Sequence, residues 1–122
     1  MKKLRIAVLL SFVAILLGCG RSAYIPWEDG DYKVYATDVD YSATALGLDH
    51  DPGLLGIVDS EVVAAGSNDL VIVVERENHK DDCIEFYIVT KGDNYAVGPF
   101  DEEEFQVEKS KRGLPDFSWR KR

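Results

Sequence analysis

Apolar and polar side chains alternate with a period of two over two stretches of the chain, residues 32–37 and 84–89. This period is typical of strands that bury one face. Residues 54–58 and 61–65 are shorter apolar runs, and residues 70–74 are apolar at every position. An apolar run without alternation predicts an interior strand that is covered on both faces.

Turn-forming residues show where these strands reverse direction. Residues 66–69 have the length and composition to join the runs on either side of them as a hairpin. Residues 91–94 predict a second hairpin, which leads into a short strand over residues 95–97 that Pro99 ends. The segments expected to be irregular are residues 38–53 and the charged residues 75–82.

The spacing of capping residues predicts one helix, over residues 102–112. Asp101 and Glu104 are spaced as a capping box, and Phe100 and Phe105 as a hydrophobic staple. Acidic residues at the start, basic residues near the end and a glycine just beyond are typical of a helix with both ends capped. We therefore expect an α+β fold, a small antiparallel β-sheet of four to six strands with this one C-terminal α-helix.

A separate apolar stretch precedes this domain. Residues 6–17 are apolar except for Ser11 and follow three basic residues at the N-terminus. Twelve helical residues would span about 18 Å, which is well short of a hydrocarbon core of about 30 Å. The stretch therefore predicts a cleaved signal helix rather than a membrane span.

Residues 16–19, Leu-Leu-Gly-Cys, resemble the lipobox of bacterial lipoproteins. The resemblance implies that residues 1–18 are removed and that Cys19 carries a diacylglyceryl anchor; the alternative is an ordinary secretory signal. Gly20 stands where an aspartate would favour retention in the inner membrane, so we expect an outer-membrane lipoprotein facing the periplasm. Residues 19–30 then form a tether without periodicity.

The mature chain is acidic, with 22 acidic and 11 basic side chains after residue 18 and a formal charge of −11. Residues 19–108 carry −16 and residues 109–122 carry +5. This balance opposes nucleic-acid binding, which needs basic residues to displace counterions from phosphates. The basic tail, residues 119–122, is expected to be a frayed, solvated terminus; the alternatives are that it folds back on the acidic body or binds anionic lipid.

Two loop clusters contain groups that can bind metals: residues 49–51, and His79 with the neighbouring Asp81, Asp82 and Cys83. Neither has the spacing of a known metal motif, so we expect no metal and no other cofactor. No nucleophile motif occurs either, which predicts a protein that is not an enzyme. Cys83 is expected to be a small, partly buried side chain whose pKa Asp81 and Asp82 raise.

The aromatic residues near the C-terminus are candidates for binding a partner. Phe117 and Trp119 follow the predicted helix and either pack back on the sheet or are offered to another macromolecule. Most other aromatic side chains have an ordinary place on a half-buried sheet.

The C-terminal half, about residues 61–115, resembles a family of small bacterial lipoproteins catalogued as a domain of unknown function. Its members carry an aromatic strand and then a Gly-Pro step into a helix. The matching segments are residues 61–65, 70–74, 86–89, 97–105 and 113–115. The resemblance implies an envelope location and this fold, and it implies no catalytic residue.

These observations predict a membrane-anchored envelope lipoprotein in which one domain, residues 31–118, binds another macromolecule without catalysis. A basic periplasmic protein is the partner that the charge favours. The alternatives are an inhibitor of a cationic enzyme such as lysozyme, or a small periplasmic enzyme.

Overall fold

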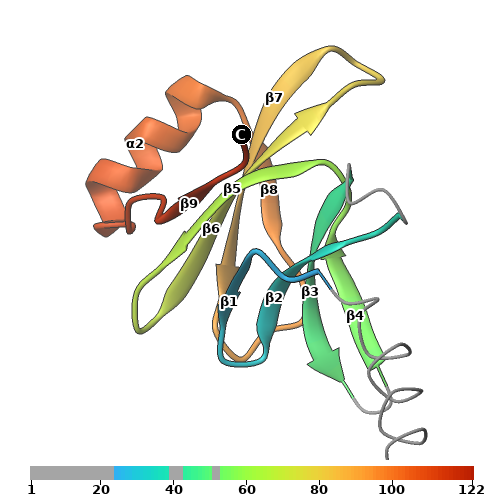
Figure 1. The fold of residues 1–122 in the computed structure, drawn as a ribbon. Coiled ribbons are helices and arrows are strands. Elements are labelled where there is room, and N and C mark those ends of the chain that lie inside the picture. Colours follow the sequence, from blue (N-terminus) through green and yellow to red (C-terminus); the bar gives the residue numbers. More distant parts are fainter. Residues whose placement is uncertain (1–23, 39–42, 51–52) are drawn as a thin grey trace, which may run out of the picture.

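The computed structural model describes residues 24–38, 43–50 and 53–122, which form two antiparallel sheets and one helix (Figure 1). The first sheet has the order β1–β2–β3–β4: β1 (Trp27–Asp29), β2 (Tyr32–Ala36), β3 (Thr44–His50) and β4 (Gly53–Val58). The second has the order β8–β7–β6–β5–β9: β5 (Val62–Ser67), β6 (Val71–Asn78), β7 (Cys83–Thr90), β8 (Val97–Phe100) and β9 (Trp119–Arg120). The helix, α2, spans Glu102–Arg112.

The second sheet is the middle layer, between the first sheet on one side and α2 on the other (Figure 1). Strand β6 has apolar side chains on both faces, and each face packs against one of these two layers. Its side chains at Ile72 and Val74 pack into the cluster between the sheets, whereas Val71 and Val73 pack into the cluster under the helix. The prediction of an interior strand covered on both faces is confirmed, except that Leu70 lies before the strand and is 73% exposed.

The α+β fold and the C-terminal helix are confirmed, but one sheet of four to six strands is wrong because the chain forms two sheets. The main cause is β3, which lies within the segment expected to be irregular. Gly47 interrupts the apolar pattern there. A Cβ atom at Gly47 would lie 2.8 Å from Cε1 of Tyr35, so the ring of Tyr35 occupies the space that a side chain would need.

Three element boundaries also differ from the sequence prediction. The expected tether, residues 19–30, is a strand from Trp27 onwards, because β1 pairs with β2. Strand β6 continues to Asn78 through the segment expected to be a charged loop. Strand β8 begins at Val97 and includes Pro99. Proline lacks a backbone N–H, and an edge strand such as β8 tolerates this because its outer side pairs with no other strand.

The helix is capped as its sequence predicts. The Glu104 backbone N–H donates to Asp101 Oδ1 at 2.7 Å, and the Asp101 N–H donates to Glu104 Oε1 at 2.9 Å. Gly113 ends the helix with a φ of 61°. Phe105 is the helix residue buried against the sheet, and its ring stacks on Phe86 with centroids 4.6 Å apart.

Polar contacts join the two sheets around the apolar cluster. The fully buried Thr44 of β3 donates its hydroxyl to the Val62 carbonyl of β5 at 2.6 Å. At the other end of the interface, Tyr32 donates its hydroxyl to the Asp93 carbonyl at 2.7 Å and accepts from the Gly92 N–H at 2.8 Å. The first sheet is therefore fixed to the second by directional bonds as well as by burial.

We expect Thr44→Val to lower the free energy of unfolding by about 1–3 kcal/mol, because it leaves the buried Val62 carbonyl without its donor. Urea unfolding measures this as a lower midpoint with an unchanged slope. The control is Thr90→Val, the same change at an exposed position, with an effect within about 0.5 kcal/mol. Equal effects for the two variants would contradict the role given to the Thr44 hydroxyl.

Candidate functional site

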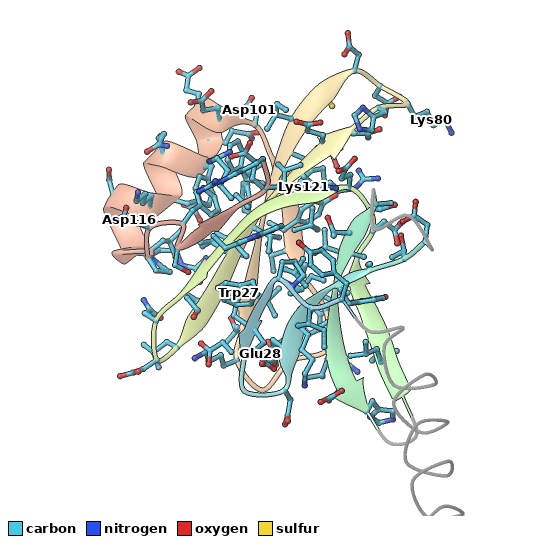
Figure 2. All side chains as sticks on the ribbon, viewed as in Figure 1. Trp27, Glu28, Lys80, Asp101, Asp116 and Lys121 are labelled. Carbon is cyan, nitrogen blue, oxygen red and sulfur yellow. The ribbon has the colours of Figure 1, made fainter. Side chains whose placement is uncertain are left out.

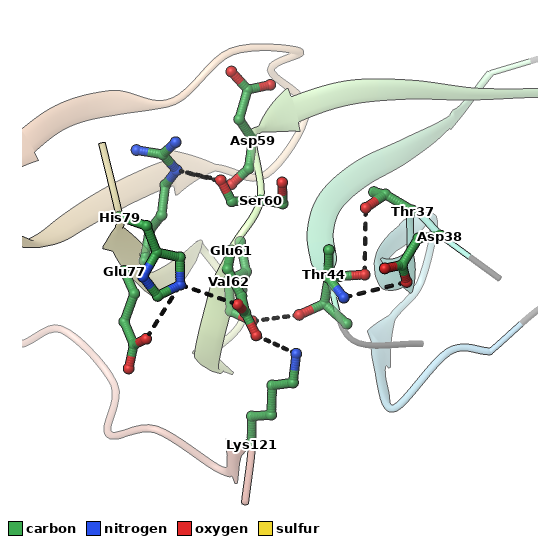
Figure 3. A network of polar contacts seen from close by, with 12 residues as sticks. Thr37, Asp38, Thr44, Asp59, Ser60, Glu61, Val62, Glu77, His79 and Lys121 are labelled. Atoms are coloured by element: carbon green, nitrogen blue, oxygen red, sulfur yellow. Dashed lines mark hydrogen bonds and ion pairs between the residues drawn. The ribbon is translucent and has the colours of Figure 1, made fainter. Parts of the chain in front are cut away.

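Two carboxylates and a histidine meet on one face of the second sheet (Figure 3). Glu61 lies just before β5 and faces Glu77 of β6: the Glu77 N–H donates to the Glu61 carbonyl at 2.8 Å, and the Glu61 N–H to the Glu77 carbonyl at 3.4 Å. Residues directly opposed in an antiparallel ladder project to the same face. His79 lies in the turn directly after β6, and its imidazole contacts both carboxylates.

The side chains of this cluster are within direct reach of one another. His79 Nε2 lies 3.3 Å from Glu61 Oε1 and 3.6 Å from Glu77 Oε2. Lys121 donates from Nζ to the other oxygen of Glu61, Oε2. Desolvation by burial raises the pKa of Glu61, but the bonds from Lys121 and His79 outweigh it and leave that pKa below its usual value. Glu61 is therefore held as a carboxylate.

Lys121 reaches this cluster because the C-terminal segment returns to the second sheet. Strand β9 pairs with β5, and the Lys121 N–H donates to the Val63 carbonyl at 2.7 Å. Arg120 donates to both carboxylate oxygens of Glu75, at 3.0 and 3.3 Å. The expectation of a frayed basic tail is wrong, and the alternative that it folds back on the acidic body is confirmed. The folded unit thus extends past residue 118.

The two candidate partner-binding aromatics pack against the domain. The Phe117 ring lies 6.3 Å from that of Phe86 and 6.0 Å from that of Phe105, measured between centroids. Trp119 packs against the cluster between the sheets. Of the two alternatives for Phe117 and Trp119, the structure shows packing on the sheet.

The C-terminal segment around Asp116 passes so close to β5 that β5 needs a glycine at position 66. A Cβ atom at Gly66 of β5 would lie 2.0 Å from the Asp116 carbonyl oxygen, so only a residue without a side chain allows the two backbones to approach this closely.

The two loop clusters that the sequence offered as metal-binding candidates do not assemble as the sequence arranges them. Asp49 pairs with Lys33, and Asp51 lies outside the described residues. In the second cluster, His79 joins Glu61 and Glu77, while Asp81 accepts a bond from Asn78 at 3.2 Å. Glu61 and Glu77 were not candidates from the sequence, because only the β5–β6 register brings residues 16 positions apart face to face.

Cys83 begins β7 and is exposed, so the expectation of a partly buried side chain is wrong. Desolvation by nearby atoms raises the pKa of the Cys83 thiol, and Glu85, Asp81 and Asp82 raise it further. The expected direction is confirmed, and the thiol is disfavoured as a nucleophile.

A second polar network lies on β6 and β7. Glu85 accepts from Arg76 Nη1 at 2.6 Å, from Asn78 Nδ2 at 3.1 Å and from the Tyr87 hydroxyl at 3.0 Å. Burial raises the pKa of Glu85, but the bonds from Asn78, Arg76 and Tyr87 prevail and lower it from its ordinary value of 4.5. Arg76 also donates from Nε to the carbonyls of Asp59 and Ser60, at 3.0 Å each, and so fixes the crossover between the sheets.

One end of the molecule gathers acidic side chains, and we call it the acidic end: residues 80–82 and 101–104. It holds six acids and one base, Lys80. Phe100 of β8 pairs with Phe86 of β7, so the chain leaves β8 in the direction of the β6–β7 turn before α2 begins. Figure 2 shows Asp101 and Lys80 at this same end of the molecule.

The chain matches no protein-family model, no curated protein and no solved structure. The fold and the site therefore define its class: a small α+β domain of two stacked antiparallel sheets and one helix, with an acidic end and a carboxylate–histidine cluster. Within residues 24–38, 43–50 and 53–122, no helix is both long and apolar enough to cross a membrane.

We expect Glu85→Gln to reduce the dependence of stability on pH. Because folding lowers the pKa of Glu85, the stability it contributes is fully present above about pH 4.5 and is lost as the pH falls through the folded-state pKa. Urea unfolding at pH 6 and pH 3 should give a smaller difference for the variant than for the wild type. Asp69→Asn, an equal charge change on an exposed turn, should keep the wild-type difference.

Proposed function

We propose that this protein is a lipoprotein of the bacterial envelope, anchored through Cys19, whose folded domain binds a cationic protein without catalysing a reaction. The observation that carries the proposal is the combination of a lipobox and signal at the N-terminus with an acidic end on the domain. The lipobox and signal support a location at a membrane, and the acidic end supports a partner of positive charge.

The support for the anchor lies in three features of residues 1–19. A basic start, an apolar stretch too short to span a bilayer and a cysteine directly after Leu-Leu-Gly occur in the order that lipoprotein export requires. Several acyl chains, each stabilised by about 0.8 kcal/mol per buried CH₂, would hold the protein at a membrane. Gly20 favours the outer membrane.

The support for a cationic partner lies in how the domain uses its own basic residues. Many of them already lie within 4.0 Å of a carboxylate: Lys33, Arg76, Lys91, Lys109, Lys111, Arg112, Arg120 and Lys121. Acidic side chains outnumber these basic residues, and six of them lie at the acidic end, where they face solvent and have no such basic partner among the described residues. A concentrated charge of one sign steers a partner of the opposite sign and speeds its association.

An inhibitor of a cationic enzyme such as lysozyme is the more specific form of this proposal. Glu102 and Glu103 lie on the exposed side of the first helical turn, whereas Asp101 and Glu104 are occupied by the capping box. The carboxylates of Glu102 and Glu103 therefore take no part in capping the helix. They form an exposed pair that can bind a basic side chain or enter a cationic cleft.

Mass spectrometry of Cys19→Ser tests the anchor. We expect the wild type, recovered from membranes, to begin at Cys19 and to carry the added mass of lipid. The variant should keep residues 1–18 or be released as a product without lipid, because only the thiol accepts the diacylglyceryl group. A wild-type chain that begins at Met1, or that bears a free thiol at Cys19, would contradict the proposal.

Binding to purified lysozyme, used as a cationic probe, tests the acidic end. We expect Glu102→Gln with Glu103→Gln to weaken binding by roughly two- to thirtyfold, since each exposed ion pair is worth about 0.2–1 kcal/mol. The effect should shrink as salt is added. The matched control is Glu28→Gln with Asp69→Asn, which removes two charges elsewhere on the domain.

Lysozyme activity measured in the same samples separates binding from inhibition. Loss of activity that follows the binding curve supports the inhibitor form. Binding with full activity supports a binding module alone. Absence of binding at micromolar concentration and low salt, or equal weakening by the two double variants, would overturn the proposal of a cationic partner at the acidic end.

A further inference from the structure

We infer that Glu61, Glu77 and His79 form a binding site for a divalent transition-metal ion, with zinc as the ion that the ligands fit best. Glu77 lies on β6, Glu61 just before β5 and His79 just after β6, next to residues 80–82 of the acidic end (Figure 3). Its three donors, two carboxylate oxygens and one imidazole nitrogen, all lie within 4.8 Å of one another.

The distances between these donors match the coordination shell of zinc. Zinc–nitrogen and zinc–oxygen bonds of about 2.0–2.2 Å in a tetrahedron place neighbouring ligand atoms about 3.3–3.6 Å apart. His79 Nε2 lies 3.3 Å from Glu61 Oε1 and 3.6 Å from Glu77 Oε2. Two of the three distances between donor atoms therefore already match a tetrahedral zinc shell, and the third is no longer than 4.8 Å.

The backbone fixes the ligands independently of any metal. Glu61 and Glu77 exchange backbone hydrogen bonds across the ladder, and His79 lies in the turn directly after β6. Lys121 binds Glu61 Oε2, so Oε1 is the oxygen that faces His79. A partner that orients a ligating carboxylate in this way is typical of metal sites, where groups outside the coordination shell tune affinity.

The charge of the site also points to a cation. Like charges directly opposite each other across a ladder are destabilising. Glu61 is compensated by Lys121, but the ion-pair contact of Glu77 is with His79, which is charged only when protonated. A bound cation would compensate the charge of the Glu77 carboxylate.

Donor type and access favour zinc over calcium. Calcium takes six to eight oxygen ligands, whereas an imidazole with carboxylates suits zinc and other first-row transition metals. The His79 side chain is 70% exposed, and a recess of about 180 Å³ adjoins it, lined by Glu77, Asp82 and Cys83 among others. The ion has an open route, and water can occupy the remaining coordination position.

Zinc titration of the full-length chain, followed by calorimetry and by competition with a chromophoric chelator, tests the site. We expect one zinc ion per chain and a rise in melting temperature with added zinc. His79→Ala and Glu77→Gln should each weaken zinc binding by roughly tenfold or more, since even groups outside the coordination shell are worth about 10–100-fold.

The matched control is His50→Ala, which removes an exposed histidine on β3 and should leave zinc affinity unchanged. All three substitutions lie at half-buried or exposed positions, and the melting temperature without metal verifies that each variant is folded. The inference is overturned if zinc does not bind, if His50→Ala weakens binding as much as His79→Ala does, or if calcium binds equally well. The zinc test varies Glu77 and His79, whereas the lysozyme test varies Glu102 and Glu103. A failure of one test therefore leaves the other proposal standing.

Discussion

The burial of β6 on both faces is the constraint on which the rest of the structure depends. Residues Val71 and Val73 point to one side of the second sheet, and Ile72 and Val74 to the other. Each side must be covered to remove apolar surface from water, at about 25 cal/mol per Å². The first sheet covers one side, and α2 covers the other together with the C-terminal segment.

Covering the sheet in this way brings distant parts of the chain to one place. The return of the C-terminal segment after α2 allows β9 to pair with β5, and this pairing brings Lys121 to Glu61. The same ladder sets Glu61 opposite Glu77. The carboxylate–histidine cluster thus follows from the register of β5 and β6 and from the return of the C-terminal segment to the second sheet.

The distribution of charge follows from the same arrangement. Basic residues that the sequence gathers near the C-terminus become partners of carboxylates on β6 or just before β5, as Arg120 does with Glu75 and Lys121 with Glu61. The start of α2 and the β6–β7 turn keep their acids facing solvent. The acidic side chains of residues 81–82 and 101–104 therefore stay exposed, while many basic residues elsewhere are paired with carboxylates.

Local features were predictable from the sequence because their physical causes lie within a few residues. The capping box of Asp101 and Glu104, the stop at Gly113 and the β5–β6 hairpin depend on neighbours along the chain, and the structure bears them out. The apolar run of β6 likewise determined that it would be covered on both faces. The export signal and the lipidated Cys19 remain predictions of the same local kind.

Tertiary structure alone decided the second sheet, the ordered C-terminus and the cluster around Glu61. Strand β3 was hidden by Gly47, whose missing side chain is replaced by the ring of Tyr35 from the neighbouring strand. Strand β9 is two residues long, too short to show a period, and exists because β5 offers it an edge. In each case the stabilising partner is remote in sequence, and a linear pattern contains no information on which remote residues will meet.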